Sequence, residues 1–432
     1  MKSTWLLVVV LVVTSSLAAR AEESACSDAA VASEAPDMVA AAPASEESAS
    51  DVAELTRIIE EQAALIESLA ARITTLESGL TNVLERAVTE GDYPSWAPKI
   101  KIGGDLRYRY EHIAEQGKNS RQRDRIRARL ALSGRVNGEL DFKVRLASGA
   151  DDPVSTNQTL TGAFSSKDIW LDQAYFDWHP NATVRVFGGK MANPFFTPGG
   201  SQLIWDGDLT PEGLALCFTG SGTNQPFLNL AQFWAEERSS GSDARVLGMQ
   251  GGLKFGSKST KGTIGLGYYN FTGVKGEPPL FDQTKSFGNS VTKDDEGNLF
   301  YATGFRELEA FAQMDWKAGN TPVALYGNWV TNTAADDDDT GWLVGLDLGS
   351  TKNPGDWKFG YNYRRLEADA VLGAWCDSDF IGGGTNGKGH AFSITTAIAQ
   401  NATFGITYLV NDKGLVNSKD YQRLQMDLGF KF

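Results

Sequence analysis

The sequence has few of the side chains from which enzymes and metal sites are usually built. Only three histidines and three cysteines occur among its 432 residues. Cys26, Cys217 and Cys376 form no C-x-x-C pair and have no histidine at metal-ligand spacing, so neither a disulfide framework nor a zinc site is predicted. No serine or cysteine lies in a nucleophile-elbow motif. We therefore expect no catalytic residues, no cofactor and no bound metal.

The sequence also lacks a basic excess and, after its first residues, any long apolar run. The formal charge of -14 argues against nucleic acid as a partner, because phosphate neutralisation needs a basic face. Residues 1–21 combine Lys2, a short apolar core and a small-x-small ending, which predicts a secretory signal peptide. No later stretch approaches about 18 continuous apolar residues. If this chain crosses a membrane, we expect it to do so without transmembrane helices.

Two N-terminal segments differ in pattern from the rest of the chain. Residues 22–50 are rich in Ala, Ser and Glu and have almost no large apolar side chain, so we expect a disordered tether. Residues 51–90 carry apolar side chains at alternating steps of three and four, which predicts an α-helical coiled coil and self-association. Its a and d residues lean towards two strands, and Gln62 at a d position is typical of a register device.

From residue 95 to 432 the apolar period changes to two. In residues 124–133, for example, apolar side chains alternate with Arg125, Arg127 and Arg129. Strict alternation predicts strands with one dry face and one wet face. Sixteen such segments are expected, near residues 100–111, 124–133, 139–147, 168–178, 182–190, 213–219, 227–236, 245–255, 262–271, 306–316, 322–331, 342–349, 357–366, 390–398, 402–410 and 421–432.

The connections between these segments alternate between short and long. Long ones are expected at 112–123, 147–167, 272–305 and 367–389, and the glycine-rich part of the last is interpreted as an external loop. An even strand count with turns at one end and long loops at the other is typical of an outer-membrane barrel. A soluble β-sandwich also alternates, but three arginines on one strand suit a water-filled lumen better than a solvent face. We therefore predict an all-β fold, a 16-stranded antiparallel transmembrane β-barrel preceded by the coiled coil.

Several motifs carry a family resemblance. The C-terminal strand ends on Phe432 and resembles the recognition strand that outer-membrane barrels present to their assembly machinery. Together with Trp170–Trp178, Val184–Phe195 and Trp205–Leu216, it resembles the putative porin family of Gram-negative bacteria. That resemblance implies a general diffusion porin, usually trimeric, surrounded by membrane lipid and lipopolysaccharide. A coiled coil before the barrel is also similar to the phosphate-selective porins, which remain a competitor.

Selectivity in a wide barrel comes from the side chains at its narrowest part, so the inward charges are the candidate functional residues. On the first three expected strands, inward basic side chains outnumber inward acidic ones. Strand 306–316, about half the barrel away, adds acidic side chains. In porins the loop corresponding to 191–211 folds into the lumen and would bring further acids. Inward charges on neighbouring strands could instead simply pair with one another. The predicted pore-lining residues are Lys101, Arg107, Arg109, Arg125, Arg127, Arg129, Lys143, Arg145, Glu307, Glu309 and Asp315, and the predicted constriction-loop residues are Asp206, Asp208 and Glu212.

Three functions remain open from the sequence. The first is an outer-membrane porin that passes small hydrophilic solutes and ions by passive diffusion. The second is a narrower anion-selective channel of the phosphate type that uses the arginines. The third is a structural barrel whose periplasmic coiled coil contacts the cell wall and anchors the envelope. In every case we expect residence in the cell outer membrane and a homo-oligomer, with three copies implied by the family resemblance.

Overall fold

The computed structural model describes residues 68, 71, 99–239, 241–257 and 259–432. The predicted signal peptide, tether and coiled coil (1–21, 22–50 and 51–90) lie, apart from residues 68 and 71, outside the described residues. The described strands of the barrel number sixteen, as the sequence predicts. They are β1 (Ile100–Glu115), β2 (Arg121–Arg135), β3 (Leu140–Ser148), β5 (Ile169–Trp178), β6 (Val184–Lys190), β7 (Glu212–Thr219), β8 (Gln225–Glu236), β9 (Ala244–Gly256), β10 (Lys261–Thr272), β13 (Phe305–Ala318), β14 (Thr321–Asn332), β15 (Thr340–Gly349), β16 (Trp357–Leu366), β17 (Gly387–Ala399), β18 (Ala402–Lys413) and β19 (Lys419–Lys431).

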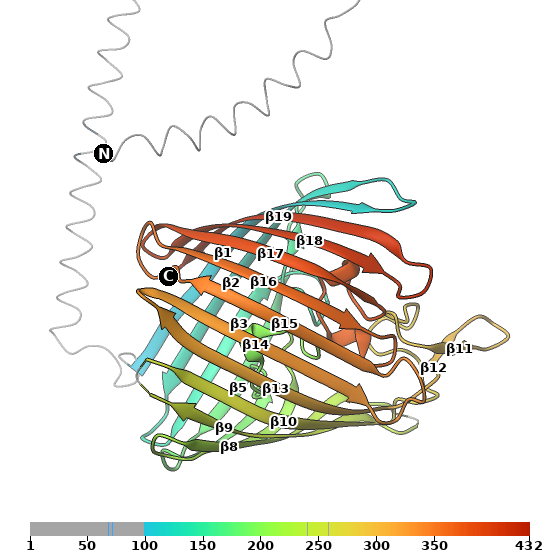
Figure 1. The fold of residues 1–432 in the computed structure, drawn as a ribbon, viewed down its shortest axis with the longest axis horizontal. Helices are drawn as coiled ribbons and strands as arrows, with labels where there is room; N and C mark the ends of the chain where they lie inside the picture. The colour runs from blue at the N-terminus through green and yellow to red at the C-terminus, as the bar shows by residue number, and fades with distance from the viewer. Residues whose placement is uncertain (1–67, 69–70, 72–98, 240, 258) are drawn as a thin grey trace, which may run out of the picture. The chain divides into compact units, whose positions relative to one another are not determined.

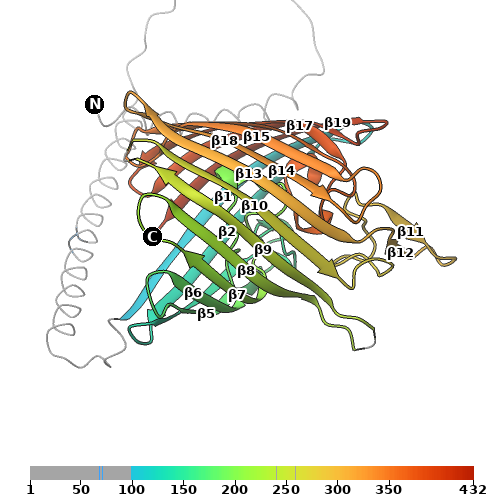
Figure 2. The same cartoon turned by 60° about the horizontal axis from the view of Figure 1, so that its bottom comes forward.

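The barrel is closed by the pairing of its first and last strands. Each barrel strand pairs antiparallel with its sequence neighbours, and β1 pairs with β19, so that Arg109 lies opposite Asp427. Figures 1 and 2 show these tilted strands wrapping around a common axis. Closure leaves the described barrel wall without a sheet edge, which a hydrocarbon environment would not tolerate.

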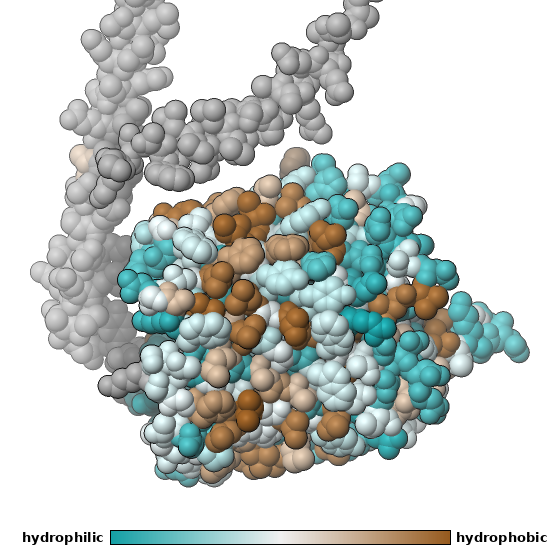
Figure 3. Space-filling model, viewed as in Figure 1, coloured by the Kyte–Doolittle hydropathy of each residue, from teal (hydrophilic) through white to brown (hydrophobic). Residues whose placement is uncertain are grey.

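The two faces of the wall differ as the period of two requires. Even-numbered residues of β1, such as Ile102 at 68% exposure, and outer residues elsewhere, such as Leu266 at 63%, face away from the lumen. In Figure 3 apolar side chains gather over the middle of the barrel surface, and hydrophilic ones gather at one end. This distribution matches a wall with hydrocarbon outside and water inside. Among the described residues, no helix is both long and apolar enough to cross a membrane.

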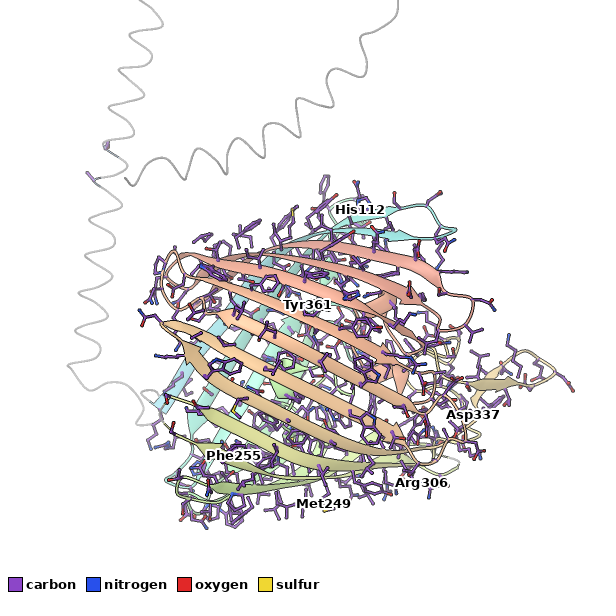
Figure 4. All side chains as sticks on the ribbon, in the orientation of Figure 1. His112, Met249, Phe255, Arg306, Asp337 and Tyr361 are labelled. Atoms are coloured by element: carbon purple, nitrogen blue, oxygen red, sulfur yellow. The ribbon has the colours of Figure 1, made fainter. Side chains whose placement is uncertain are left out.

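The two ends of the barrel differ in their connections. Four long connections, 149–168, 191–211, 273–304 and 367–386, leave from the same end, which we call the long-loop end. In Figure 4, Arg306 and Asp337 lie at this end and Phe255 at the opposite, short-turn end. Three small strands complete the described sheets. β4 (Gln158–Thr159) belongs to the barrel sheet and pairs with β2 beyond the end of β3, whereas β11 (Val291–Lys293) and β12 (Leu299–Tyr301) form a separate hairpin at the long-loop end.

The connection expected at 112–123 is much shorter than the sequence predicts. β1 continues to Glu115 and β2 begins at Arg121, with Ile113 paired to Arg121, so only residues 116–120 connect them. Apolar and polar side chains stop alternating regularly in residues 112–123. The sequence pattern therefore predicted that both strands end earlier than they do. Backbone pairing does not depend on that alternation and carries the hairpin further.

Three of the long connections reach the inner surface of the barrel. In 149–168, Asn157 accepts hydrogen bonds from Arg107 of β1 and Arg125 of β2. We call 191–211 the first inward loop and 367–386 the second inward loop. The first crosses from β6 to the far wall, where the Gly199 amide donates to the Gln313 side chain of β13 at 2.8 Å. Gly199 has a φ of +60°, and a Cβ there would lie 2.4 Å from the Tyr326 ring, so only glycine fits this approach. The second inward loop was expected outside the barrel, and the structure corrects this, because its Leu372 amide donates to the Glu307 carboxylate of β13 at 3.0 Å.

An apolar core inside the barrel holds both loops. Phe195 of the first inward loop packs edge-on against Tyr269 of β10, with ring centroids 4.9 Å apart. Trp205 stacks with Trp375 of the second inward loop at 6.1 Å. Leu203, Leu372 and further buried side chains extend this cluster towards β13 to β16. Because apolar burial fixes the loops against β8 to β16, the charged inner surface is concentrated on the opposite wall, around β1, β2 and β19.

Candidate functional site

Basic side chains cover one part of the inner surface, on β1, β2, β3 and β19. Odd-numbered residues of these strands face inwards, since their even-numbered neighbours such as Leu130 and Phe430 are exposed outside. Lys101, the remaining predicted basic residue, lies on the same inner face at the exposed start of β1. The basic wall consists of Arg107, Arg109, Arg123, Arg125, Arg127, Arg129, Lys143, Arg145 and Arg423.

Strand carboxylates bind several of these guanidiniums directly. Asp427 accepts two hydrogen bonds from Arg109, at 2.6 and 2.7 Å. Glu111 is fully buried and accepts from Arg423 at 2.7 Å and from Arg123. Further pairs in the wall join Asp105 to Arg127 and Arg129, and Asp172 to Arg145.

The first inward loop adds one carboxylate to this network. Asp208 lies 3.3 Å from the Arg129 guanidinium and also accepts from the Thr156 hydroxyl at 3.1 Å. The loop acid therefore contacts the arginines rather than facing them across an open gap. Glu212 lies elsewhere, because it is the first residue of β7 and its exposed side chain pairs with Lys190 at 2.9 Å.

Asp206 joins the two inward loops to each other. Its carboxylate accepts from the Ser378 amide at 2.9 Å, and its own amide donates to the Trp375 carbonyl at 2.7 Å. Burial raises the pKa of Asp206 to about 8, and the nearby Asp377 carboxylate adds to the shift. At neutral pH this side chain is therefore mostly protonated, and it acts as a link between loops rather than as a pore charge.

The second inward loop supplies an acid that the sequence did not single out. Asp379 lies 2.7 Å from Arg423 and 3.2 Å from Arg109, and accepts from Gln425 at 2.9 Å. Burial alone would raise the pKa of Asp379, but the guanidiniums of Arg423 and Arg109 hold it well below its usual range. One signal could have indicated this position: the apolar run 371–375 is unexpected in a loop exposed to water.

A neighbouring pair anchors the same loop to the barrel. Asp377 pairs with the buried Arg364 of β16 at 2.7 Å. The Arg364 guanidinium also lies over the Phe380 ring, 4.6 Å from its centroid. This anchor holds the backbone on both sides of Asp379.

The charges in the basic wall do not cancel. Six carboxylates lie within 4.0 Å of at least one of its nine cations, which leaves a surplus of three positive charges in this set of groups. The carboxylates are Asp105, Glu111, Asp172, Asp208, Asp379 and Asp427.

The acids predicted on strand 306–316 are on the inner face, but two of them are covered. Glu307 and Glu309 are 0% and 2% exposed beneath the inward loops. Glu309 accepts from Tyr269 at 2.7 Å, Asn328 at 2.7 Å and Gln250 at 3.1 Å. Asp315 is partly exposed and accepts from Gln313. Glu307 and Glu309 therefore hold the loop side of the lumen together instead of lining open water.

A recess of about 360 Å³ opens on the inner surface towards the short-turn end. One side is formed by Arg107 and Arg127 with Asp105 and Asp427. The other side carries hydroxyl groups from β17 and β18 and a lysine near a turn. The polar residues on that side are Thr351, Lys352, Thr395, Asn401, Thr403 and Thr407, and Lys431 of β19 lies beside Asp105.

Comparisons with known proteins agree with this architecture. A family model described as "Putative porin" matches residues 114–304 and 282–432. The fold is similar to the high pH structure of OprB from Pseudomonas putida, with 13% identity, a TM-score of 0.54, and coverage of 77% of this chain and 94% of that one. Salmonella typhi OmpF in complex with daunomycin gives 10% identity and a TM-score of 0.47, covering 77% and 97%. A comparison with curated proteins found no match.

Proposed function

Because this chain belongs to the putative porin family and forms an outer-membrane porin channel, we propose that it passes small hydrophilic solutes and ions by passive diffusion. The single observation that carries the proposal is the closed barrel with an apolar outer face and a charged inner face. The solute path would lie along the basic wall, beside the points where Asp208 and Asp379 of the inward loops contact it. Family and fold are those of a channel rather than of an enzyme.

Reconstitution into a planar lipid bilayer tests this proposal. Purified protein should produce stepwise increases of current in potassium chloride. It should also let small sugars enter proteoliposomes at rates that fall with solute size. Folded protein that inserts into the bilayer and leaves the membrane silent would contradict passive diffusion.

A second candidate is a preference for anions, and the surplus of three cations in the basic wall favours it. A positive surface with low-dielectric walls raises the local concentration of anions. Under a potassium chloride gradient the reversal potential should have the sign of chloride permeation. Replacing chloride by phosphate then separates a general anion channel from a phosphate-type one, and a cation preference would exclude both.

Self-association is supported by the short strands of one wall. β6 and β7 have 7 and 8 residues, whereas β9 and β13 have 13 and 14. At about 3.3 Å per residue and a tilt of about 45°, 7 or 8 residues span roughly 16 to 19 Å, which is less than an apolar band of about 25 Å. We assign the wall β3 to β7 to contacts between copies, three per assembly, as the family resemblance implies.

Outer side chains on this wall provide the test of the interface. Trp178→Arg on β5 should dissociate the unheated detergent complex into single barrels, because it places a charge in an apolar contact. Leu266→Arg on β10, on the other side of the barrel, is the matched control and should leave the copy number unchanged. Dissociation by both variants, or by neither, would argue against this wall as the interface.

The N-terminal segments complete the proposal. Residues 1–21 would be removed on export, and residues 22–50 would tether the coiled coil 51–90 in the periplasm. Phe432 would be read by the barrel assembly machinery, so deletion of this residue should reduce assembled barrel in the outer membrane. The envelope-anchoring alternative predicts that deletion of 22–90 loosens the outer membrane from the cell wall while the single-channel conductance stays the same.

A further inference from the structure

We propose that the recess towards the short-turn end is a binding site for small organic anions that also carry hydroxyl groups. This inference rests on the proposed diffusion function, because the solute reaches the recess through the lumen. The proposal assigns hydroxylated organic anions to the recess as one stage of their passage through the lumen. The carboxylate or phosphate group would lie at the arginine side and the hydroxyl groups at the threonine side.

The arginine side provides a positive charge that the protein does not fully use. The Arg107 guanidinium donates to the Asn157 side chain, but its buried Nε has no acceptor among the described residues. The nearest carboxylate oxygen, from Asp427, lies 3.8 Å from this Nε. A buried donor without an acceptor destabilises the structure, and an anionic oxygen would supply the missing acceptor.

The carboxylates beside the recess are already occupied. Asp427 is held by two hydrogen bonds from Arg109, and Asp105 is held by Arg129 in addition to Arg127. Neither Arg109 nor Arg129 lines the recess. The recess is lined by four cations and two carboxylates, and arginines outside the recess largely neutralise those two carboxylates. The remaining positive charge favours the binding of an anion over that of a neutral solute or a cation.

The opposite side provides hydroxyl groups at matching positions. Thr395 of β17 and Thr403 and Thr407 of β18 occupy inward positions, as alternation with the exposed Ile394 and Phe404 requires. Threonine hydroxyls both donate and accept, so they can pair with the hydroxyl groups of a solute in several orientations.

Glycines make room for the solute between these threonines. Gly405 and Gly429 also occupy inward positions, and a Cβ at these positions would lie 3.2 and 3.3 Å from the Thr395 and Thr403 hydroxyls. Among the described residues, these two glycines leave that part of the recess without a side chain of their own. The volume of about 360 Å³ accommodates a six-carbon polyol acid together with a few waters.

Current fluctuations through single channels provide the test. Three probes separate charge from hydroxyl groups: gluconate carries both, acetate carries charge only, and glucose carries hydroxyl groups only. Gluconate should block the current in a saturable way at a concentration about tenfold below that of either other probe, because both sides of the recess contribute. Glucose 6-phosphate beside inorganic phosphate repeats the comparison for phosphate esters.

Variants place the block in the recess. Arg107→Gln should raise the half-blocking concentration of gluconate about tenfold, and the double variant Thr403→Val with Thr407→Val roughly fivefold, with no change for acetate in the second case. Arg185→Gln removes a luminal arginine of β6 that does not line the recess and should leave the gluconate block unchanged.

The possible outcomes distinguish this inference from the function on which it rests. Normal conductance with equal block by gluconate and acetate would overturn the binding site and keep the porin. Equal effects of Arg107→Gln and Arg185→Gln would also overturn it, since general luminal charge would then explain the block. A silent bilayer would contradict passive diffusion itself.

Discussion

Asp379 of the second inward loop gives the sharpest prediction about selectivity. Its carboxylate contacts Arg423 and Arg109 in the basic wall, and its pKa is held well below the usual range, so it is ionised at all working pH values. Asp379→Asn keeps the shape of the side chain and removes one negative charge. The surplus of positive charges on the basic wall then rises from three to four.

The size of the effect follows from the distance to a permeating ion. At roughly 8 Å in water, one unit charge contributes about 0.5 kcal/mol without screening and about 0.2 kcal/mol at physiological salt. An anion gains this energy and a cation loses it, so the permeability ratio of chloride to potassium should rise about two- to fivefold. The shift should be larger at low salt.

The assay is the reversal potential under a potassium chloride gradient, recorded at two ionic strengths. Glu212→Gln is the matched control, because it removes a carboxylate from the exposed start of β7 and should leave the reversal potential unchanged. A folded Asp379→Asn barrel with an unchanged ratio would refute the assignment of Asp379 to the pore. A shift towards potassium would refute the charge balance itself.

Three further predictions concern the inward loops and their supports. Glu309→Ala should lower the free energy of unfolding by about 2 to 4 kcal/mol, because the buried Tyr269 hydroxyl and Asn328 amide lose this acceptor, while Gln250 keeps the Phe196 carbonyl. Glu309→Gln should cost less, and urea unfolding of the purified barrel measures both. Arg364→Ala should make the single-channel current noisier, because Asp377 and Phe380 lose the side chain that holds them. The control Arg365→Ala removes only an ion pair with Glu367 on the outer face and should leave the noise unchanged. Since the folded-state pKa of Asp206 is raised to about 8, its contribution to stability is complete below its unfolded value near 3.8 and is lost as pH rises through about 8. The melting temperature should therefore fall from pH 5 to pH 9, and Asp206→Asn should flatten that profile.

The candidate site was only partly predictable from the sequence. Alternation assigned Arg127 and Glu307 to the same side of the wall as the other predicted inward residues. It could not say that Glu307 lies under a loop while Arg127 borders a recess, because burial by a loop leaves no period in the strand. Arg423 and Asp379 were missed for the same reason, since their contact joins a strand to a loop 44 positions away in the sequence.

The sequence by itself determined the strand count, the inner and outer faces, and the end of the barrel that carries the long connections. These properties depend on local repetition, since a side-chain period of two places each residue without knowledge of any other strand. Only the tertiary structure decided which long connections fold inwards and which charges remain unpaired. Those outcomes depend on apolar contacts such as Phe195 with Tyr269 and on ion pairs such as Arg109 with Asp427, whose partners come together only when the barrel closes.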